Sequence, residues 1–591
     1  MTSPIADYAL IGDGRTAALV ARNGSIDFLC LPGFDSDACF AAMLGDEGNG
    51  CWRIAPAGFV TGVARRYRGD TLVLETEFAT DTGAVRLTDF MPWHDGEPMV
   101  VRIVEGLRGE VEVSALLRLR FDYGRVPPWI RPTAGGFYAD AGAHQLLFHA
   151  SCPLQVGDGD ARAAFTLRRG QKQVFSLMYA PSYEPSPRKR DVPKLLRQTE
   201  AAWQGWIDRF RPSGRWDGAV RRSLLTLKAL IDRRTGGLVA AASLGLPEVP
   251  GGAMNWDYRY CWLRDATFTL TALLNAGFRE EAVRWRDWIL RALAGDPRQM
   301  QIMYRVDGSR RLDEYRADWL RGHQGARPVL VGNAASAQTQ LDVYGELIDS
   351  FHVAARAGVP RTERDIAVEI ALIEHLEGAW DRPGADIWEG RGDPQRYTYS
   401  QAMAWVGVNH FVEDPAMRAA AGDELVGRMQ ALRGTIHDAV CARGYSTARG
   451  HFVQRYGGEA LDASLLLLPL VGFLPASDPR IAGTIAAVER ELMDGGLVRR
   501  QPARGDGRDE GAFLACSCWL ADCMAMQGRA QEAAALLDRV VALSNDVGLL
   551  SEEYHVPTRQ PIGNTPQALS HLSVVNSALL QSRPVVQRGA A

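Results

Sequence analysis

The sequence predicts a multidomain β + α protein, with an N-terminal antiparallel β-sandwich followed by a closed ring of helices. Three observations predict this fold class. The chain has 591 residues, which is too long for a single hydrophobic core. Short apolar runs separated by turn residues fill positions 1–190, and the hydrophobic period becomes helical near residue 215. We therefore expect a β-sandwich domain at 1–190, a helical linker at 191–215 and a helical domain at 216–591.

The first domain is expected to consist of strands joined by hairpins. The runs AALVARNGSIDFLCLP and TLVLETEFATDTGAVRLTDF each hold two strand-like segments around a turn signal. These signals are Asn23-Gly24 and Asp81-Thr82-Gly83, and both supply residues that suit tight hairpin turns. Such hairpins, repeated over nearly 190 residues, are typical of a large antiparallel sandwich.

Helical periodicity marks the rest of the chain. The segment GAVRRSLLTLKALIDRRTGG places Val220, Leu224, Leu227 and Ile231 on one face and ends in a glycine pair. Similar segments follow and give eleven or twelve helices without a strand series between them. Since no repeat of fixed period is visible, we expect no regular solenoid. Consecutive helical hairpins can instead close into a ring of inner and outer helices, with a central pocket lined by the loops at one end.

Composition narrows the function classes. Hydrophobic residues make up 46% and charged residues 23% of the chain, and the net charge is −4, which is typical of a soluble globular protein. We expect no nucleic-acid or membrane partner, because both require a clustered basic surface. No apolar run is long enough for a membrane span, the N-terminus lacks a secretory signal, and the nine cysteines are thinly spread. We expect a cytoplasmic protein, and the sequence leaves open whether it forms a homo-oligomer.

Two motifs resemble cofactor sites but lack the context that such sites need. ALIGDGRTAALV has the G-x-G-x-x-A spacing of a dinucleotide fingerprint, yet another strand-like run begins too soon for a helix of useful length. A hairpin is the better interpretation. The cysteines of FLACSCWLADCMAM lie in an apolar helical run without a histidine cluster, which favours buried thiols over zinc. We expect neither a cofactor nor a metal.

The stretch NWDYRYCWLRDATFTL, residues 255–270, concentrates aromatic and charged side chains. Tyr258 and Trp262 belong to four alternating aromatics, and Arg264 and Asp265 follow. The alternation predicts an extended backbone up to Asp265, which is placed to cap the helix that begins at ATFTLTALL. The stretch fits a core strand with a capped helix. It also fits a sugar site, because aromatic faces pack on pyranose rings while Arg and Asp bind hydroxyls.

Two glutamates far apart in the chain are candidates for acid–base chemistry. Glu389 follows Trp388 before a glycine-rich turn, and desolvation by the indole would raise its pKa as a general acid needs. Glu552 and Glu553 lie side by side in LLSEEYH, in an expected irregular loop between two late helices. If the helices form a ring, this loop and that of Glu389 overlook one pocket. Inverting glycosidic hydrolysis needs an acid and a base roughly 6.5–9.5 Å apart.

Six ordered blocks spread over the whole chain resemble glycoside hydrolase family 15. They are LIGDGRTAALVARNGSIDFLCLPGFDSDACFAAMLG, NWDYRYCWLRDATF, RPVLVGNAASAQTQLDVYGE, DIWEGRG, EGAFLACSCWLADCMAMQG and LLSEEYH. Within this family of glucoamylase-like, inverting α-glucosidases, the chain is most similar to the bacterial trehalase-like branch with an N-terminal β-sandwich. The resemblance implies a twelve-helix (α/α)6 barrel, which agrees with the helix count.

The resemblance also implies roles for individual residues. Glu389 matches the general acid of the family, and Glu552, in the Ser-Glu-x-Tyr element, matches the general base. Glu553 is expected to anchor its loop or to contact the leaving sugar. The other matches are expected to bind the substrate or to shape its pocket: Tyr258, Trp262, Arg264, Asp265, Arg327 and Trp388.

One departure from the family pattern bears on the substrate. Gly390 and Arg391 follow the acid, where starch-acting members commonly carry a second acidic residue, so recognition of the leaving sugar should differ. We predict an inverting exo-α-glucosidase that acts on a small α-glucoside, with α,α-trehalose as the leading substrate. The alternatives are a glucoamylase-like hydrolase of malto- or isomalto-oligosaccharides, a phosphorylase and a catalytically silent sugar-binding protein. The presence of both carboxylates argues against the last two.

Overall fold

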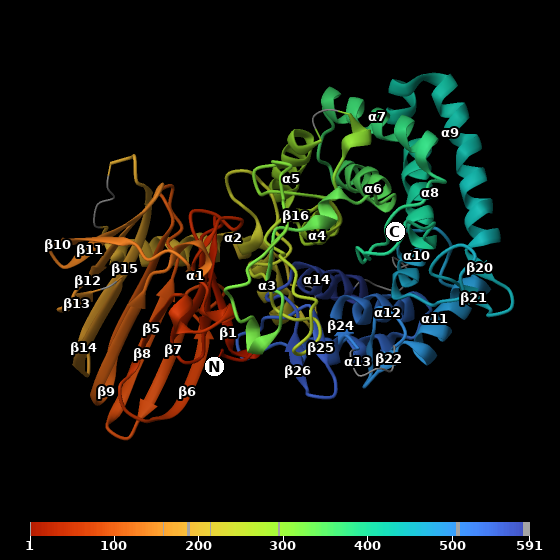
Figure 1. Cartoon of the computed structure of the whole chain (residues 1–591). Coiled ribbons are helices and arrows are strands. Elements are labelled where there is room, and N and C mark those ends of the chain that lie inside the picture. The colour runs from red at the N-terminus through yellow and green to blue at the C-terminus, as the bar shows by residue number, and fades with distance from the viewer. Residues whose placement is uncertain are drawn as a thin grey trace.

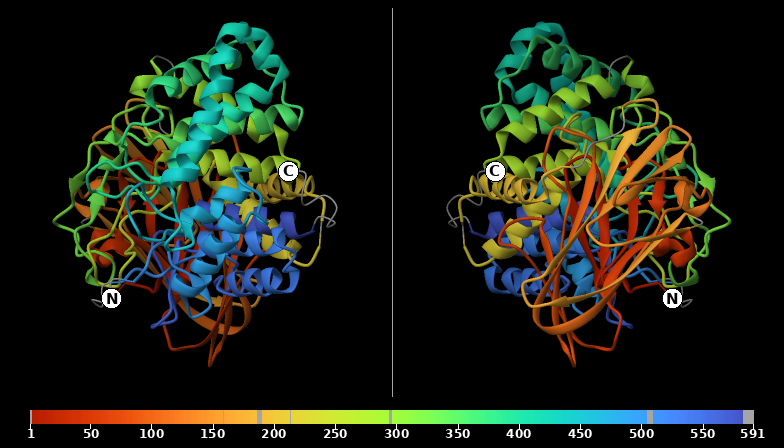
Figure 2. Two further views of the ribbon diagram at one scale, coloured as in Figure 1. Left: turned by 90° about the vertical axis from the view of Figure 1, so that its right-hand side faces the viewer. Right: turned by 90° about the vertical axis from the view of Figure 1, so that its left-hand side faces the viewer.

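The computed structural model describes residues 2–157, 159–185, 190–212, 214–293, 296–503 and 509–582. An N-terminal β part and a C-terminal helical part lie side by side (Figure 1), and each faces the viewer in one panel of Figure 2. The predicted fold class, an antiparallel β domain followed by a helical barrel, is confirmed. Among the described residues, no helix has both the length and the apolarity needed to cross a membrane.

The β part is built from two antiparallel sheets that share one long strand, β9 (Met99–Arg118). The first half of β9 pairs with β8 and β15, and its second half pairs with β5 and β14. The strands of the sheet that contains β5 are β1 (Tyr8–Gly12), β2 (Ala17–Ala21), β3 (Ser25–Cys30), β4 (Ala38–Phe40), β5 (Cys51–Pro56), β13 (Gln155–Gly157) and β14 (Asp160–Arg168). The strands of the other sheet are β6 (Val60–Tyr67), β7 (Leu74–Thr80), β8 (Gly83–Phe90), β10 (Trp129–Thr133), β11 (Gly136–Ala141), β12 (His144–Ala150) and β15 (Lys172–Pro181).

The predicted hairpins are present. Asn23-Gly24 joins β2 to β3, and Gly24 has a φ of +79°, a conformation that glycine adopts without steric cost. Asp81-Thr82 joins β7 to β8, which begins at Gly83. The ALIGDGRTAALV segment forms the antiparallel pair β1–β2 and not a strand followed by a helix, so it lacks the helix N-terminus of a dinucleotide site.

Helix α2 (Val192–Ile207) lies between the two parts and contacts both. The Asp191 side chain accepts a hydrogen bond from the backbone N–H of Lys194 and caps its N-terminus. Trp203 packs edge-on against Trp93 of the β part, with ring centroids 4.8 Å apart. Three residues later, Trp206 stacks on Phe278 of the helical part at 4.2 Å. Aromatic packing on both sides therefore holds the parts together.

The helical part is a double ring, as predicted. The inner helices, within the described residues, are α4 (Leu263–Asn275), α6 (Asp342–Arg356), α8 (Thr398–Glu413), α10 (Leu467–Leu470), α12 (Leu514–Met526) and α14 (Ala568–Ser582). The outer helices are α3 (Asp217–Leu230), α5 (Arg279–Ala292), α7 (Glu363–Ala379), α9 (Pro415–Arg443), α11 (Pro479–Glu491) and α13 (Ala530–Val541). Helix α12 is buried from Leu514 to Ala525, whereas α13 buries only one face. This pair shows the contrast between an inner helix that is buried on all sides and an outer helix that buries a single face.

Short elements connect the helices. The β part also holds a single helical turn, α1 (Phe121–Gly124). The strand pairs of the helical part are β16 (Cys261–Trp262) with β17 (Met303–Tyr304), β18 (Tyr315–Arg316) with β19 (Leu330–Val331), β20 (Tyr445–Ser446) with β21 (His451–Phe452), and β22 (Met493–Asp494) with β23 (Leu497–Val498). A three-stranded sheet holds β24 (Ala512–Phe513), β25 (Glu553–His555) and β26 (Gln560–Ile562).

Two local predictions are wrong. Asp265 does not cap a helix, because α4 begins at Leu263 and Asp265 is its third residue. The extended run ends at Trp262 and not at Asp265, because α4 begins at the next residue. The segment LLSEEYH is also not irregular throughout, because Glu553 pairs with Phe513 across β25 and β24.

Candidate active site

A pocket lies at the N-terminal ends of the inner helices. Its inner compartment is lined by segments that precede or begin α4, α8, α12 and α14, and these segments carry Tyr258, Glu389, Arg500 and Glu552. An outer compartment of about 270 Å³ adjoins it and shares Tyr258, Trp388, Glu389 and Arg500 as lining residues. The ring topology therefore brings together side chains that are up to roughly 300 residues apart in the chain, in keeping with the loops of a double helical ring.

Glu389 occupies a strained turn that faces this pocket. Its φ is +61°, a conformation that costs energy for a residue with a Cβ and that is common at functional sites. The turn is held by backbone contacts. The N–H of Glu389 donates to the carbonyl of Asp386 at 3.1 Å, and the Gln338 amide donates to the carbonyls of Glu389 and Gly390 at 3.1 and 3.2 Å.

The carboxyl group of Glu389 has two donors on one oxygen. Trp262 Nε1 donates to Oε1 at 2.6 Å, and Arg264 Nη2 donates to the same atom at 2.9 Å. Burial raises the pKa of Glu389 to about 7, although Arg264 and the Trp262 hydrogen bond act to lower it. The direction of this shift agrees with the prediction. The contacting indole is that of Trp262, since Trp388 Nε1 donates instead to the two carboxylate oxygens of Asp462 at 3.0 and 2.9 Å.

Glu552 is almost fully buried, with 1% of its surface exposed. The Tyr258 hydroxyl donates to its Oε1 at 2.8 Å, while Oε2 has no hydrogen-bond partner among the described residues. Burial and the nearby Glu248 carboxylate raise the pKa of Glu552 well above its ordinary value, whereas Arg500 and Tyr258 lower it. One carboxylate oxygen is thus held in place by Tyr258, and the other is buried without a hydrogen-bond partner among the described residues.

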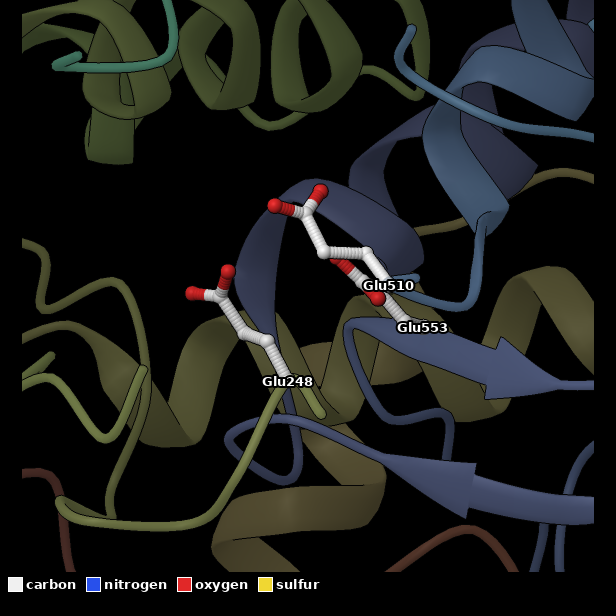
Figure 3. Close-up of side chains that lie close together, drawn as sticks. All are labelled: Glu248, Glu510 and Glu553. Carbon is white, nitrogen blue, oxygen red and sulfur yellow. The ribbon is translucent and has the colours of Figure 1, made fainter. Parts of the chain in front are cut away.

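Arg500 lies among three further carboxylates, those of Glu248, Glu510 and Glu553. Figure 3 shows these glutamates close together, and one oxygen of each lies within 4.8 Å of the others. Arg500 Nη2 is 2.8 Å from Glu248 Oε2, 2.7 Å from Glu510 Oε2 and 3.7 Å from Glu553 Oε1. The guanidinium of Arg500 therefore balances the negative charge of these carboxylates, a role that a bound metal ion has in other clusters of acids.

The hydroxyl of Tyr258 joins this acidic cluster to Glu552. Tyr258 Oη is 3.2 Å from Glu248 Oε1 as well as 2.8 Å from Glu552 Oε1. A phenol has one proton to donate, so it serves only one of the two carboxylates at a time. Glu248 and Glu552 are therefore coupled through one hydroxyl, and the protonation of one affects that of the other.

The remaining walls of the inner compartment combine aromatic faces with fixed charges. Arg264 Nη1 donates to Gln340 Oε1 at 2.9 Å, which holds the guanidinium in place beside Glu389. The buried Asp265 also lines the compartment. Tyr258 and Trp262 pack edge to face with centroids 5.4 Å apart, and Trp519 stacks on Trp388 at 6.0 Å. Such walls suit a ring with apolar faces and equatorial hydroxyls.

The structure brings most, but not all, of the predicted site residues together. Those that line the inner compartment are Tyr258, Trp262, Arg264, Asp265, Trp388, Glu389 and Glu552. Glu553 lies behind them, where its Oε2 accepts a hydrogen bond from the Gly511 N–H at 2.8 Å. Arg327 is exposed, donates through Nε to the Arg321 carbonyl at 3.3 Å and is absent from the lining of both described compartments.

Sequence reasoning missed the arginine that does line the pocket. Arg500 stands in VRRQPARGDG, where its neighbour Arg499 is of the same type and no motif distinguishes the two. Its position before an inner helix, like those of Glu389 and Glu552, is the one signal that favours it. Glu248 lies in the same kind of loop, in LGLPEVPGG ahead of the aromatic stretch, and was missed for the same reason.

The outer compartment has a wall of its own. The guanidinium of Arg391 lies over the Trp256 ring, 4.9 Å from its centroid, and Nη2 pairs with Glu314 Oε2 at 3.0 Å. The same Glu314 oxygen accepts from the Ala334 N–H at 3.0 Å. This cation–π contact and ion pair hold Arg391 at the rim, two residues after Glu389.

A barrel of paired helices whose mouth holds a half-buried and a buried glutamate between aromatic walls is the arrangement of a glycoside hydrolase. Comparison with known proteins agrees with this class. Residues 214–579 match the model of the family described as Glycosyl hydrolases family 15, and residues 1–156 match that of a Trehalase-like, N-terminal domain. The chain belongs to glycosyl hydrolases family 15.

Full-length relatives carry the comparison further. The chain is 35% identical to a trehalase of Mycolicibacterium smegmatis, over 98% of this chain and 91% of that one. It is 33% identical to a trehalase of Thermoplasma volcanium, over 97% and 92% of the two chains. A crystal structure of a bacterial glucoamylase complexed with acarbose superimposes with a TM-score of 0.75 at 13% identity, covering 100% of this chain and 97% of that one. This likeness confirms the (α/α)6 barrel fold.

Proposed function

We propose that this glycoside hydrolase cleaves α,α-trehalose into two glucoses with inversion at the anomeric carbon. Relatives that are named trehalases match the chain over nearly its full length, which supports trehalose as the substrate. The observation that carries the mechanism is the unequal environment of the two glutamates. One oxygen of Glu389 accepts hydrogen bonds from Trp262 and Arg264, whereas one oxygen of Glu552 has no partner among the described residues.

Glu389 is the proposed general acid. With a pKa raised to about 7 by burial, it still holds its proton near neutral pH. In the reaction this proton passes to the glycosidic oxygen as the bond from that oxygen to the anomeric carbon breaks. The electron pair of the bond leaves with the oxygen, and the second glucose departs as an alcohol. Arg264 then stabilises the carboxylate that remains, since its guanidinium already contacts Glu389 Oε1 at 2.9 Å.

Glu552 is the proposed general base. Its free Oε2 is suited to accept a hydrogen bond from a water molecule, while Tyr258 holds Oε1 in place. The water oxygen attacks the anomeric carbon from the face opposite to the leaving group, and one of its protons passes to Glu552. This role requires Glu552 to be ionised. Arg500 and the Tyr258 hydroxyl favour the ionised form, and Glu248 opposes it.

The two compartments are proposed to hold one glucose each. In the inner one, Arg264 and Asp265 bind hydroxyls of the glucose that is attacked, while Trp262 packs on the ring. The outer compartment holds the leaving glucose between Trp256 and the acidic cluster. Its volume of about 270 Å³ suits a single sugar ring better than an extended chain.

The proposal extends to the organisation of the chain. We propose a β-sandwich domain at 1–190, a helical linker at 191–215 and a catalytic barrel at 216–591. The family models, which match 1–156 and 214–579, support this division. A cytoplasmic location is also proposed, because nine free cysteines, eight of them buried, suit a reducing compartment.

A substrate panel tests the proposed function. Purified enzyme is incubated with equal concentrations of trehalose, maltose, isomaltose and starch, and glucose release is followed enzymatically. The proposal predicts the highest kcat/KM for trehalose. Faster cleavage of maltose or isomaltose would favour the glucoamylase-like alternative, and binding of trehalose without hydrolysis of any sugar would favour the silent sugar-binding protein.

A further inference from the structure

A second cavity lies at the other end of the barrel, at the C-terminal ends of the inner helices. Its volume is about 620 Å³. Phe268 on α4 and Trp519 on α12 line both this cavity and the inner compartment, so they form a floor between the two. Further along the same helices, Asn275 and Met526 line this cavity but not the inner compartment. We call it the lower cavity.

Three buried oxygens of the lower cavity lack hydrogen-bond partners among the described residues. They are Oδ1 of Asp522, Oγ of Ser573 and Oδ1 of Asn576. Asp522 is 5% exposed and Ser573 is 2% exposed, so neither is at the protein surface. An unmet buried polar group costs roughly 1–3 kcal/mol, and three in one cavity are therefore unusual for a region that serves packing alone.

These oxygens lie on two neighbouring helices. Ser573 and Asn576 are three residues apart on α14, which places them on one face of that helix. Asp522 stands on α12, which packs against α14. The remaining acid of the lining, Asp349, is already paired with His410 at 2.9 Å. The three oxygens without partners thus belong to two adjacent helices that line the same cavity. The rest of the lining is largely apolar.

We propose that the lower cavity is a binding site for a neutral polyol about the size of one hexose, separate from the catalytic pocket. The apolar face of such a ligand packs on Phe268 and Trp519, and its hydroxyls donate hydrogen bonds to Asp522, Ser573 and Asn576. The C-terminal ends of the surrounding helices favour hydroxyl donors as well, because their free carbonyls carry partial negative charge.

The charge state of the cavity agrees with a neutral ligand. Burial raises the pKa of Asp522 to about 8, so this carboxyl is mostly uncharged at pH 7. Asp349, the other acid of the lining, is already in contact with His410 Nε2 at 2.9 Å. A cavity of about 620 Å³ has the volume of roughly twenty water molecules, which leaves room for one hexose and several waters.

The ligand would also contact the aromatic floor that borders the catalytic pocket. Trp519 stacks on Trp388 with ring centroids 6.0 Å apart and planes 29° apart, and Trp388 directly precedes Glu389. A polyol that packs on Trp519 would therefore contact a ring that stacks directly on Trp388, a residue of the catalytic pocket.

The test uses D-glucose as the probe and measures binding rather than catalysis. Crystals of the wild-type enzyme soaked in glucose should show a sugar in the lower cavity in addition to any sugar in the two catalytic compartments. In the double variant Ser573→Val/Asn576→Leu, the stoichiometry measured by isothermal titration calorimetry should fall by one glucose per chain relative to the wild type. Empty density in the lower cavity, or an unchanged stoichiometry in the double variant, would overturn the proposal.

Two controls separate this result from misfolding and from the catalytic assignment. Thr271→Val alters another lining residue, but that hydroxyl already donates to the Thr267 carbonyl at 3.3 Å, so glucose binding should be unchanged. The double variant replaces unpartnered polar atoms by apolar ones, so without glucose its melting temperature should equal or exceed that of the wild type. A failure of the trehalose assignment would change the substrate panel but not the density in the lower cavity.

Discussion

Glu248→Gln should move the acidic limb of the pH profile to lower pH. This limb reports the ionisation of the proposed base, Glu552, in the free enzyme. Glu248 raises the pKa of Glu552 by charge repulsion. The two carboxylates contact the same Tyr258 hydroxyl at 3.2 and 2.8 Å, so these oxygens are no more than about 6 Å apart. At that distance two unit charges repel by about 3 kcal/mol at an effective dielectric constant near 20.

This repulsion corresponds to about two pH units. Arg500 is 2.8 Å from Glu248 Oε2 and cancels part of its charge, so we expect a shift of roughly one to two units. The sign follows from the role of Glu552 as a base. Removal of the neighbouring charge lowers its pKa, the group stays ionised at lower pH, and kcat/KM is retained further into the acid range.

The assay is kcat/KM for trehalose measured from pH 4 to pH 9 for the wild type and for Glu248→Gln. Glu510→Gln is the matched control, because Glu510 pairs with Arg500 at 2.7 Å while Glu248 is the acid that also contacts Tyr258. It should shift the acidic limb less. The basic limb, set by Glu389 near pH 7, should stay in place in both variants. An acidic limb that is unmoved or moves to higher pH in Glu248→Gln would refute the reasoning.

Four further outcomes follow from the site and the barrel. Glu389→Gln and Glu552→Gln should each lower kcat by about 10²-fold or more in steady-state assays, with the fold intact by circular dichroism. Arg264→Lys keeps the charge but loses the planar fork that spans two acceptors, so kcat/KM should fall about tenfold or more; an unchanged value would contradict its role. Arg391→Ala removes the rim of the outer compartment and should raise the ratio of kcat/KM for maltotriose to that for trehalose. Asp522 has its folded-state pKa raised from 3.8 to about 8, so its protonated form stabilises the fold below about pH 4 and this contribution is lost as pH rises toward 8. The melting temperature of Asp522→Asn, measured by calorimetry, should therefore exceed that of the wild type by a larger margin at pH 8 than at pH 5.

The succession of helices could be predicted because helical periodicity is a local property of the sequence. The hydrophobic pattern alone does not separate the two layers of the ring, since the inner helix α6 and the outer helix α13 are both amphipathic. Closure into a ring was expected from the run of consecutive helices and from the family resemblance. The hairpins at Asn23-Gly24 and at Asp81-Thr82 were predictable for a similar reason, because turn chemistry is local.

The details of the site depended on contacts that no local pattern records. Asp265 had the residue type of an N-cap, but a two-residue pairing with β17 let α4 begin at Leu263. The donor to Glu389 is Trp262, which is 127 residues away, and not the adjacent Trp388. Arg500 is held at the pocket by four carboxylates that come from three separate segments of the chain. A residue that owes its place in the site to charged partners far away in the sequence cannot be recognised from its own type or from its neighbours in the chain.

The anomeric form of the released glucose tests the central claim most directly. Cleavage of α,α-trehalose is followed by ¹H NMR within the first minutes, before mutarotation mixes the anomers. Attack by water from the face opposite to the leaving group predicts equal initial amounts of β-glucose, from the attacked ring, and α-glucose, from the leaving ring. Initial release of α-glucose alone would contradict inversion and the roles assigned to Glu389 and Glu552.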